Sequence, residues 1–228
     1  RTKLYFSMEN LILQQFFVFT FSERHDKMCS YLYFSFLRGQ TMDSNFFALI
    51  SRMRYIARWG LMRNALPENI QEHSHMVAVL AHALGVIRRD IFHQPCDVNA
   101  LATAALYHDA SEILTGDLPT PIKYHNAEIM SAYHAVEDLA VQKLLGMLPP
   151  ELRETYADVL AEDKDGDIYP LVKAADKLSA YIKCIEERKA GNNEFLSAEA
   201  QTRAALEASP PPEVQYFLEH FIPAFERD

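Results

Sequence analysis

From Met42 onward, apolar residues recur at three- and four-residue steps, a spacing typical of amphipathic helices. The run Pro67-Glu68-Asn69 predicts the start of one such helix, which reaches about Arg89. The apolar stripe of this helix consists of Ile70, His73, Val77, Leu80, Leu84 and Ile87. His73 is therefore expected on the face that packs against the core.

A second predicted helix also carries ionisable side chains on its core-facing side. Asp97 predicts the N-cap of this helix. Its core face then consists of Leu101, Ala105, His108 and Glu112. The run from Gly116 to Pro121 contains two prolines and predicts the end of the helix and a loop with a fixed backbone. The core face thus has a potential ligand and a potential base where leucine is usual.

The rest of the chain has the same helical pattern. Ser44 predicts the cap of a helix that reaches about Arg54, and Pro170 leads into a helix that reaches about Lys189 and carries Asp176. Further helices are expected over 127–147, 150–161 and 197–208, with the charged stretch 162–167 as a solvated loop and a final aromatic segment over 214–225. The sequence has no clear strand pattern, so the predicted fold class is all-α, a helical bundle.

Residues 1–41 differ from the rest because they are crowded with Phe and Tyr and lack helical periodicity. Their apolar stretch, Leu11 to Phe21, is shorter than the roughly 20 residues that a membrane-spanning helix needs. We expect residues 1–41 to be an N-terminal extension outside a catalytic domain at 42–228. A segment that associates with a membrane is the alternative.

Composition narrows the possible functions. The chain has 228 residues, 49% of them hydrophobic, which suits one soluble domain with a substantial core. A net charge of -9 disfavours a nucleic-acid polymer as a partner, and an anionic substrate would need a local cation. The three cysteines, Cys29, Cys96 and Cys184, are widely spaced, which favours the reducing cytoplasm over a disulfide framework.

Four ionisable side chains on three predicted core helices suggest one shared explanation. A buried Asp inside a helix, such as Asp176, is costly unless its charge is compensated. A His in an apolar stripe is more often a hydrogen-bonded core residue than a ligand. One divalent cation would satisfy all of these groups, and mixed nitrogen and oxygen ligands suit Mn, Fe, Co or Zn. The predicted ligands are His73, His108, Asp109 and Asp176.

Other polar residues could complete a hydrolytic site. Glu112, one turn beyond His108, could take a proton from a water molecule, or could be an exposed helix-end residue. Arg58 has the forked donors that bind phosphate, and Trp59 could wall off a sugar or a base. An Arg-Trp pair is, however, more often part core and part surface. Asp117 could accept a hydrogen bond from a substrate hydroxyl or could cap its own turn.

The order His, His-Asp and Asp on successive helices resembles the signature of the HD superfamily of metal-dependent phosphohydrolases. Within it, the chain from about Met42 is similar to the bacterial 5'-deoxynucleotidases, which hydrolyse 2'-deoxyribonucleoside 5'-monophosphates to deoxynucleosides and phosphate. The HD pair alone is a weak motif, whereas YHDASE joined to TGDLPTP is highly specific. The matching segments are Arg58–Asn64, Glu68–Ser74, Tyr107–Tyr124, Leu171–Cys184 and Ala190–Leu196.

The resemblance implies an all-helical homodimer with one divalent transition metal per chain, Co²⁺ or Mn²⁺. It implies that Glu112 activates the attacking water and that Arg58 orients the phosphate. The implied metal ligands are His73, His108, Asp109 and Asp176, and all of them except His108 would also contact the substrate. The implied sugar-binding residues, which would exclude ribose, are Trp59, Asp117, Leu118, Pro119 and Thr120.

Two other functions compete with this interpretation. Another nucleotide phosphohydrolase of the superfamily, acting on a cyclic dinucleotide or a guanosine polyphosphate, would need further His ligands in register, and the sequence shows none. A non-catalytic helical module would hold a structural metal with four protein ligands and no water. Glu112 and Arg58 would then have no purpose.

Overall fold

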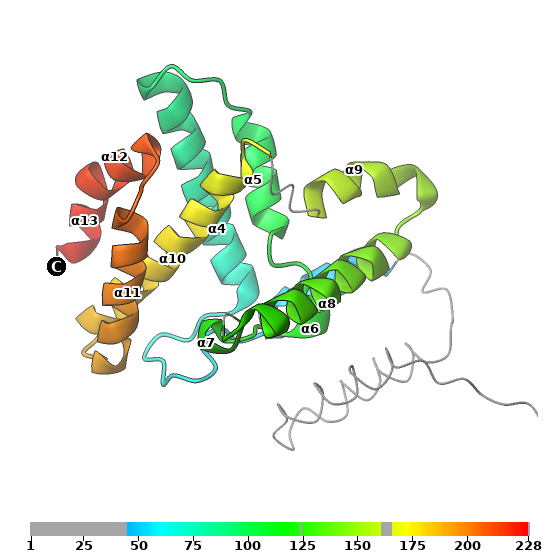
Figure 1. Cartoon of the computed structure of the whole chain (residues 1–228), viewed down its shortest axis with the longest axis horizontal. Coiled ribbons are helices and arrows are strands. Elements are labelled where there is room, and N and C mark those ends of the chain that lie inside the picture. Colours follow the sequence, from blue (N-terminus) through cyan, green and yellow to red (C-terminus); the bar gives the residue numbers. More distant parts are fainter. Residues whose placement is uncertain (1–44, 124, 161–165, 228) are drawn as a thin grey trace, which may run out of the picture. The chain divides into compact units, whose positions relative to one another are not determined.

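A computed structural model describes residues 45–123, 125–160 and 166–227, which lie within one unit, Asp43–Asp228. Helices form this part of the chain, and its strand-type pairing is limited to a single bridge between Ala57 and Asn69 (Figure 1). The all-α prediction is confirmed. The elements are α3 (Phe46–Ile50), η1 (Ser51–Tyr55), α4 (Ile70–Val86), η2 (Ile87–Ile91), α5 (Val98–Tyr107), α6 (Glu112–Thr115), α7 (Thr120–Lys123), α8 (Ala127–Gly146), α9 (Pro150–Leu160), α10 (Tyr169–Lys189), η3 (Asn193–Phe195), α11 (Leu196–Glu207), α12 (Pro212–His220) and α13 (Ile222–Glu226).

Several predictions concern positions outside the described residues. They are the extension at 1–41, the Ser44 cap and most of the charged loop, 162–165. Among the described helices, none has the combination of length and apolarity that crossing a membrane requires.

The start of α4 lies where the sequence predicts it, because a capping box forms there. The Asn69 side chain accepts a hydrogen bond from the Glu72 backbone N–H at 3.1 Å, and the Glu72 carboxylate accepts one from the Asn69 backbone N–H at 3.2 Å. Such a cap stabilises a helix by about 1 kcal/mol. It fixes the first turn of α4, which carries His73.

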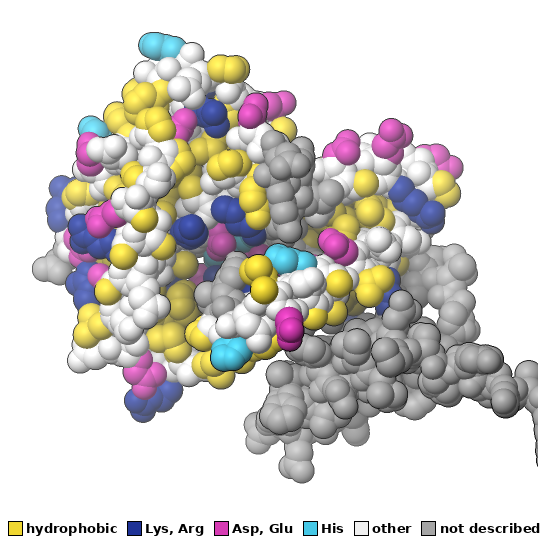
Figure 2. All heavy atoms as spheres, in the orientation of Figure 1, with side chains coloured by type: hydrophobic (Ala, Val, Ile, Leu, Met, Phe, Trp, Pro, Cys, Tyr) yellow, Lys and Arg dark blue, Asp and Glu magenta, His cyan; other side chains and the backbone are white. Residues whose placement is uncertain are grey.

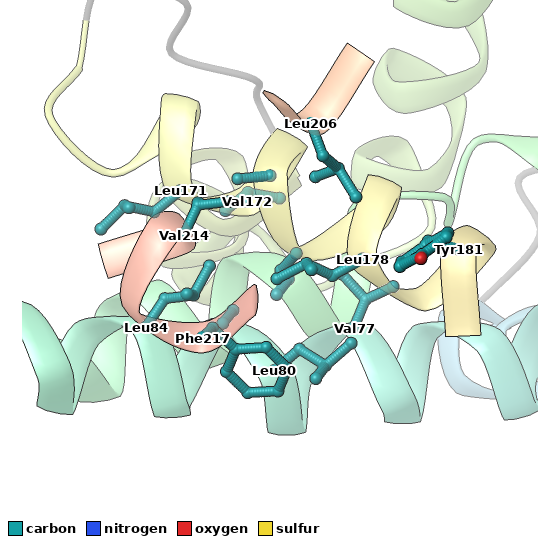
Figure 3. Close-up of a cluster of buried hydrophobic side chains, with 14 of the residues drawn as sticks. Val77, Leu80, Leu84, Leu171, Val172, Leu178, Tyr181, Leu206, Val214 and Phe217 are labelled. Atoms are coloured by element: carbon teal, nitrogen blue, oxygen red, sulfur yellow. The ribbon is translucent and has the colours of Figure 1, made fainter. Parts of the chain in front are cut away.

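The hydrophobic core lies where α4 packs against both α5 and α10. Gly85 allows the close approach of α4 to α5, because a Cβ atom there would lie 3.0 Å from a methyl carbon of Leu101. Figure 3 shows side chains of α4, α10, α11 and α12 meeting in one cluster. Its labelled members are Val77, Leu80, Leu84, Leu171, Val172, Leu178, Tyr181, Leu206, Val214 and Phe217. This packing holds α4, α5 and α10 in fixed relative positions.

The expectation of one continuous helix from Asp97 to the Gly116 loop is wrong. Asp97 does cap α5, by accepting hydrogen bonds from the backbone of Asn99 and Ala100, but α5 ends at Tyr107. The chain then forms a tighter turn, in which the Ala110 N–H donates to the Tyr107 oxygen, and α6 begins at Glu112. One cause is His108, whose Nδ1 donates to the backbone oxygen of Ala105, the acceptor that a continuing α-helix would use.

One other predicted helix is also divided. The one expected to reach Arg54 consists of α3 followed by the 3₁₀ segment η1, where the Ser51 hydroxyl bonds to the Ala48 oxygen. The final aromatic segment, 214–225, lies in α12 and α13. Pro223 near the start of α13 has no N–H to continue the hydrogen-bond pattern of α12.

Glu187 of α10 is buried and anchors the loop that precedes α4. Its carboxylate accepts hydrogen bonds from the backbone N–H groups of Ala65 and Leu66, at 2.8 and 3.0 Å, and from the Asn192 side chain at 2.7 Å. Lys183, one turn earlier, forms an ion pair with it. Burial alone would raise the pKa of Glu187, but these hydrogen bonds lower it to about 2. The carboxylate is therefore charged and holds the loop.

We expect Glu187→Gln to lower the free energy of unfolding by about 3 kcal/mol at neutral pH, because a buried lysine loses its counter-ion. The folded-state pKa, about 2, lies below the ordinary value of 4.5, so this contribution is complete above about pH 4.5 and is lost as the pH falls toward 2. Denaturant unfolding of both proteins at a series of pH values measures the difference. Glu186→Gln changes the exposed neighbour and is the control. An equal decrease in the free energy of unfolding in the two variants at neutral pH would contradict this role of Glu187.

Candidate active site

Three helical segments that are distant in sequence bring three possible metal ligands together. His73 lies in the first turns of α4, His108 directly follows α5, and Asp176 lies within α10. One ligand atom from each residue lies within 4.8 Å of the other two. His73 is fully buried, and the Asp176 side chain is 33% exposed, so the cluster reaches from the core to the surface. Figure 2 shows acidic and basic side chains close together around a hollow in the middle of the face.

Asp109 lies in the same cluster. Its Oδ2 is 3.1 Å from His108 Nε2 and 3.5 Å from His73 Nε2, and Asp176 Oδ1 is 3.1 Å from His73 Nε2. Both Nε2 atoms are buried, yet neither has a hydrogen-bond partner among the described residues. Two ligands about 2.1 Å from one ion, at right angles, are about 3 Å apart. The spacing and the unpartnered nitrogens therefore fit a shared divalent cation.

Hydrogen bonds at the other ring nitrogens orient both imidazoles. His73 Nδ1 lies 3.2 Å from Ser179 Oγ, and His108 Nδ1 donates to the backbone oxygen of Ala105 at 2.7 Å. A proton on each Nδ1 leaves the lone pair of Nε2 available, as a metal-bound histidine requires. Ser179 has no role predicted from the sequence. Its spacing of three residues from Asp176 was the available signal, since it places both side chains on one face of α10.

The two aspartates of the cluster are anionic. Burial opposes ionisation of Asp109, but His108, His73 and Arg58 lower its pKa far below the usual value. Burial likewise opposes ionisation of Asp176, and the two histidines lower its pKa. Two carboxylates and two imidazoles form a mixed oxygen and nitrogen donor set, which suits Mn, Fe, Co or Zn.

Glu112 begins α6 beside this cluster and is buried, with 7% of its surface exposed, so the alternative of an exposed helix-end residue is wrong. Its Oε2 has no hydrogen-bond partner in the described part of the chain. Burial and the negative charges of Asp109 and Asp117 raise the pKa of Glu112 well above its ordinary value. A carboxylate with a raised pKa binds a proton more strongly, which suits a general base.

Arg58 and Trp59 border the cluster on the segment between η1 and α4. Arg58 Nη1 lies 3.4 Å from Asp109 Oδ2, and Arg58 Nε donates to Glu68 Oε2 at 3.1 Å. The Trp59 indole N–H donates to the same Glu68 oxygen at 3.0 Å. The Trp59 ring packs against Phe195, with the ring centroids 5.2 Å apart. The guanidinium therefore lies beside the candidate ligands, where a phosphate-binding group is needed.

Trp59 has a strained backbone. Its φ is 59°, in the left-handed region that favours glycine. A bulky residue there costs on the order of 1–3 kcal/mol, and such strain is concentrated at functional sites. The contacts of Trp59 with Glu68 and Phe195 offset this cost and hold the residue in place.

The proline-containing loop lies close to the same groups. Burial raises the pKa of Asp117, and the charges of Arg58 and Asp109 act on it in opposite directions. The structure therefore brings Asp117 near the cluster. The other expected members of this loop are Leu118 and Pro119, both half-buried, and Thr120, which begins α7 and whose side chain lies outside the described atoms.

Two further groups near Glu112 were not anticipated from the sequence. Tyr133 Oη is buried and has no hydrogen-bond partner within the described residues, and Lys123 Nζ lies 4.5 Å from the centre of the Tyr133 ring. Lys123 also pairs with Glu137 at 2.9 Å. The charge of Glu112 acts on the pKa of both Lys123 and Tyr133. Neither residue belongs to a spacing pattern, so no sequence signal pointed to them.

Solved structures share this fold. An HD-domain phosphohydrolase from Listeria innocua matches with a TM-score of 0.71 and 26% identity, over 79% of this chain and 88% of that one. The HD phosphohydrolase DatZ of cyanophage S-2L, solved with dA and one catalytic Zn²⁺, matches with a TM-score of 0.53 and 24% identity, over 79% of this chain and 96% of that one. The second likeness is one of fold alone.

Sequence comparisons are more specific. Two curated relatives, each named 5'-deoxynucleotidase YfbR, come from Shigella boydii serotype 18 and Escherichia coli K12 / DH10B. They are 51% and 50% identical over 184 residues, which cover 80% of this chain and 92% of each relative. Residues 45–225 match the family described as 5'-deoxynucleotidase YfbR-like. The chain therefore belongs to the YfbR-like family of 5'-deoxynucleotidases.

Proposed function

We propose that this chain hydrolyses 2'-deoxyribonucleoside 5'-monophosphates to deoxynucleosides and phosphate, with one divalent transition metal per chain. The observation that carries the proposal is the cluster of two carboxylates with two imidazole nitrogens that have no hydrogen-bond partner among the described residues. Beside it lies a buried carboxylate, that of Glu112, whose Oε2 also has none. A structural metal site has no need of Glu112 next to its ligands. The arrangement therefore supports a hydrolase more than a non-catalytic module.

The proposed metal ligands are His73, His108, Asp109 and Asp176. Their mixed donor set suits several ions of the first transition series, and Co²⁺ and Mn²⁺ are the ions to test first. When bound, such an ion stabilises charge on the phosphoryl oxygens and lowers the pKa of water.

The chain's own residues supply the remaining functions. Arg58 donates from its terminal nitrogens to phosphoryl oxygens and balances the charge that spreads over them in a loose transition state. Glu112 accepts the proton of the attacking water at Oε2, the atom that has no protein partner. His73, Asp109 and Asp176 also line the phosphate side of the substrate.

The sugar is bound by the groups that border Arg58 and Glu112. Trp59 forms an apolar wall where a ribose would present its 2'-hydroxyl, and Asp117 accepts a hydrogen bond from another sugar hydroxyl. The backbone of Leu118, Pro119 and Thr120 completes the wall. An apolar wall that rejects one added hydroxyl lowers kcat/KM for the hydroxylated substrate by about 10²-fold.

Phosphate release from matched deoxyribo- and ribonucleoside 5'-monophosphates tests the proposal. We expect kcat/KM to favour each deoxynucleotide by about 10²-fold, with activity lost in EDTA and restored by Mn²⁺ or Co²⁺. A cyclic dinucleotide and a guanosine polyphosphate serve as the competing substrates. Comparable turnover of ribo- and deoxyribonucleotides, or faster turnover of either competing substrate, would refute it.

We further propose that residues 42–228 form the catalytic domain and act as a cytoplasmic homodimer, without a membrane or nucleic-acid polymer as partner. Exposed apolar side chains on α4, such as Met76 and Val79, support a partner surface. The net charge of -9 weighs against a nucleic acid. A monomer in sedimentation experiments at micromolar concentration would contradict the dimer.

A further inference from the structure

Glu68 joins two residues that the proposed function places on different parts of the substrate. Its Oε2 accepts hydrogen bonds from Arg58 Nε at 3.1 Å and from Trp59 Nε1 at 3.0 Å. The side chains of Arg58 and Glu68 are only 12% and 15% exposed, so water competes little for these bonds. A single carboxylate oxygen thus fixes the side chains of two consecutive residues.

The backbone strengthens this connection. The Arg58 N–H donates to the Glu68 backbone oxygen at 3.0 Å, and the Ile70 N–H donates to the Ile56 oxygen at 3.0 Å. These bonds align the segment around Arg58 with the residues just before α4. Since α4 carries His73 in its first turns, Glu68 links the Arg58 segment to the helix of a candidate metal ligand.

The bond to Glu68 also orients the Arg58 guanidinium. Glu68 takes the single N–H at Nε, so the two terminal nitrogens remain for a ligand, and Nη1 already lies 3.4 Å from Asp109 Oδ2. The planar group cannot rotate about its inner bonds without breaking the contact with Glu68. Its terminal donors are therefore kept on the side of the candidate metal ligands.

Trp59 is held from two directions. Glu68 binds the indole N–H, and Phe195, which is fully buried, packs against the ring at an angle of 58°. The left-handed backbone of Trp59 brings its side chain to the same carboxylate as that of Arg58, although neighbouring side chains usually diverge. Without Glu68, nothing polar among the described residues holds the indole nitrogen.

We propose that Glu68 is a positioning residue that sets the phosphate-binding Arg58 and the sugar-facing Trp59 together, so that turnover and deoxyribose preference depend on one carboxylate. This inference rests on the proposed function and names a determinant of its specificity. Glu68 acts through its two partners and need not touch the substrate.

The single tryptophan makes the inference directly measurable, because the protein has one indole N–H resonance and one source of tryptophan fluorescence. In Glu68→Ala we expect that resonance and the emission maximum to shift. We expect kcat/KM for a deoxynucleotide to fall roughly 10- to 100-fold, as for misplaced catalytic groups. The ratio of kcat/KM for the deoxyribonucleotide to kcat/KM for the ribonucleotide should also fall. Affinity for Co²⁺ should stay within about twofold of the wild-type value, because no proposed ligand is changed.

Three matched variants complete the experiment. Glu68→Gln keeps the side-chain volume and one acceptor oxygen, so kcat/KM and the deoxyribose preference should fall less than in Glu68→Ala. It replaces the alanine variant in the experiment if that variant fails to fold. Glu194→Gln breaks the Arg63 ion pair of the same loop without touching Arg58 or Trp59, and it should leave the resonance and the ratio unchanged. Trp59→Phe removes the N–H, so adding Glu68→Ala to it should change the ratio little further.

The outcomes separate this inference from the proposed function. An unshifted indole resonance in both Glu68 variants, or a ratio that does not change when the resonance shifts, overturns the role of Glu68. If Glu194→Gln changes the indole resonance and the deoxyribo-to-ribo ratio as much as the Glu68 variants do, the role of Glu68 is overturned as well. A general loosening of the loop would then explain the changes in all of these variants. If the wild-type chain hydrolyses no deoxynucleotide, the proposed function fails, and the resonance alone still decides whether Glu68 holds Trp59.

Discussion

Replacing Glu112 by Gln is expected to lower kcat by roughly 10²- to 10⁴-fold, the usual contribution of a general base. Glu112 has a buried Oε2 without a protein partner, and burial together with Asp109 and Asp117 raises its pKa, so it is equipped to take a proton. Gln has the same shape but cannot accept that proton. Steady-state phosphate release from a deoxynucleoside monophosphate, at saturating Co²⁺ or Mn²⁺, measures the loss.

The exposed Glu154 on α9 provides the matched control, since Glu154→Gln makes the same substitution at a position with no proposed role. It should retain wild-type kcat. Affinity for the divalent ion should be nearly unchanged in Glu112→Gln, because Glu112 is not a proposed ligand. If Glu112→Gln turns over as fast as the wild type, the metal is structural or another base acts, and the proposed mechanism fails.

Removing one proposed metal ligand is expected to abolish activity altogether. His108→Ala deletes an imidazole whose buried Nε2 has no hydrogen-bond partner among the described residues, and it leaves Asp109 without one of the groups that lower its pKa. We expect phosphate release to fall to the level seen with EDTA. His82→Ala, an exposed histidine on α4, is the control.

A second measurement does not depend on activity. An ion that binds only the folded state at 100 times its Kd stabilises the protein by about 2.7 kcal/mol. The wild type should therefore unfold at a higher temperature when Co²⁺ is added, and His108→Ala should show no such shift. A shift of equal size in both proteins would remove His108 from the ligand set.

Local rules accounted for the ends of several helices. The Asn69 capping box and the Asp97 cap are short-range signals, and each lies where the sequence indicates. The apolar stripe of the helix after Asn69 also placed His73 in the core, where it is fully buried. Such features depend on residues within one or two turns of each other.

Other features depend on contacts that a single sequence does not encode locally. The break after Tyr107 involves a hydrogen bond from a side chain, that of His108, to a backbone oxygen. The strained φ of Trp59 persists because Glu68 and Phe195 hold it, and Phe195 is more than a hundred residues away. Periodicity contains no information on either contact.

The sequence allowed us to predict which residues form the candidate site better than how those residues are held in place. His73, His108, Asp109 and Asp176 were identified as unusual ionisable groups on core helices, and the structure brings them together. Ser179, which orients His73, offered only its three-residue spacing from Asp176 as a signal, and Glu68 offered none, because a lone Ser or Glu has many ordinary roles.

Titration of Co²⁺ into the metal-free chain, followed by calorimetry, tests most directly whether four side chains from three helical segments bind one ion. The account predicts one equivalent per chain for the wild type and strongly weakened binding in each of the variants His73→Ala, His108→Ala, Asp109→Asn and Asp176→Asn. Binding that persists unchanged in any of these variants, or a wild type that binds no ion at a stoichiometry near one, would contradict it.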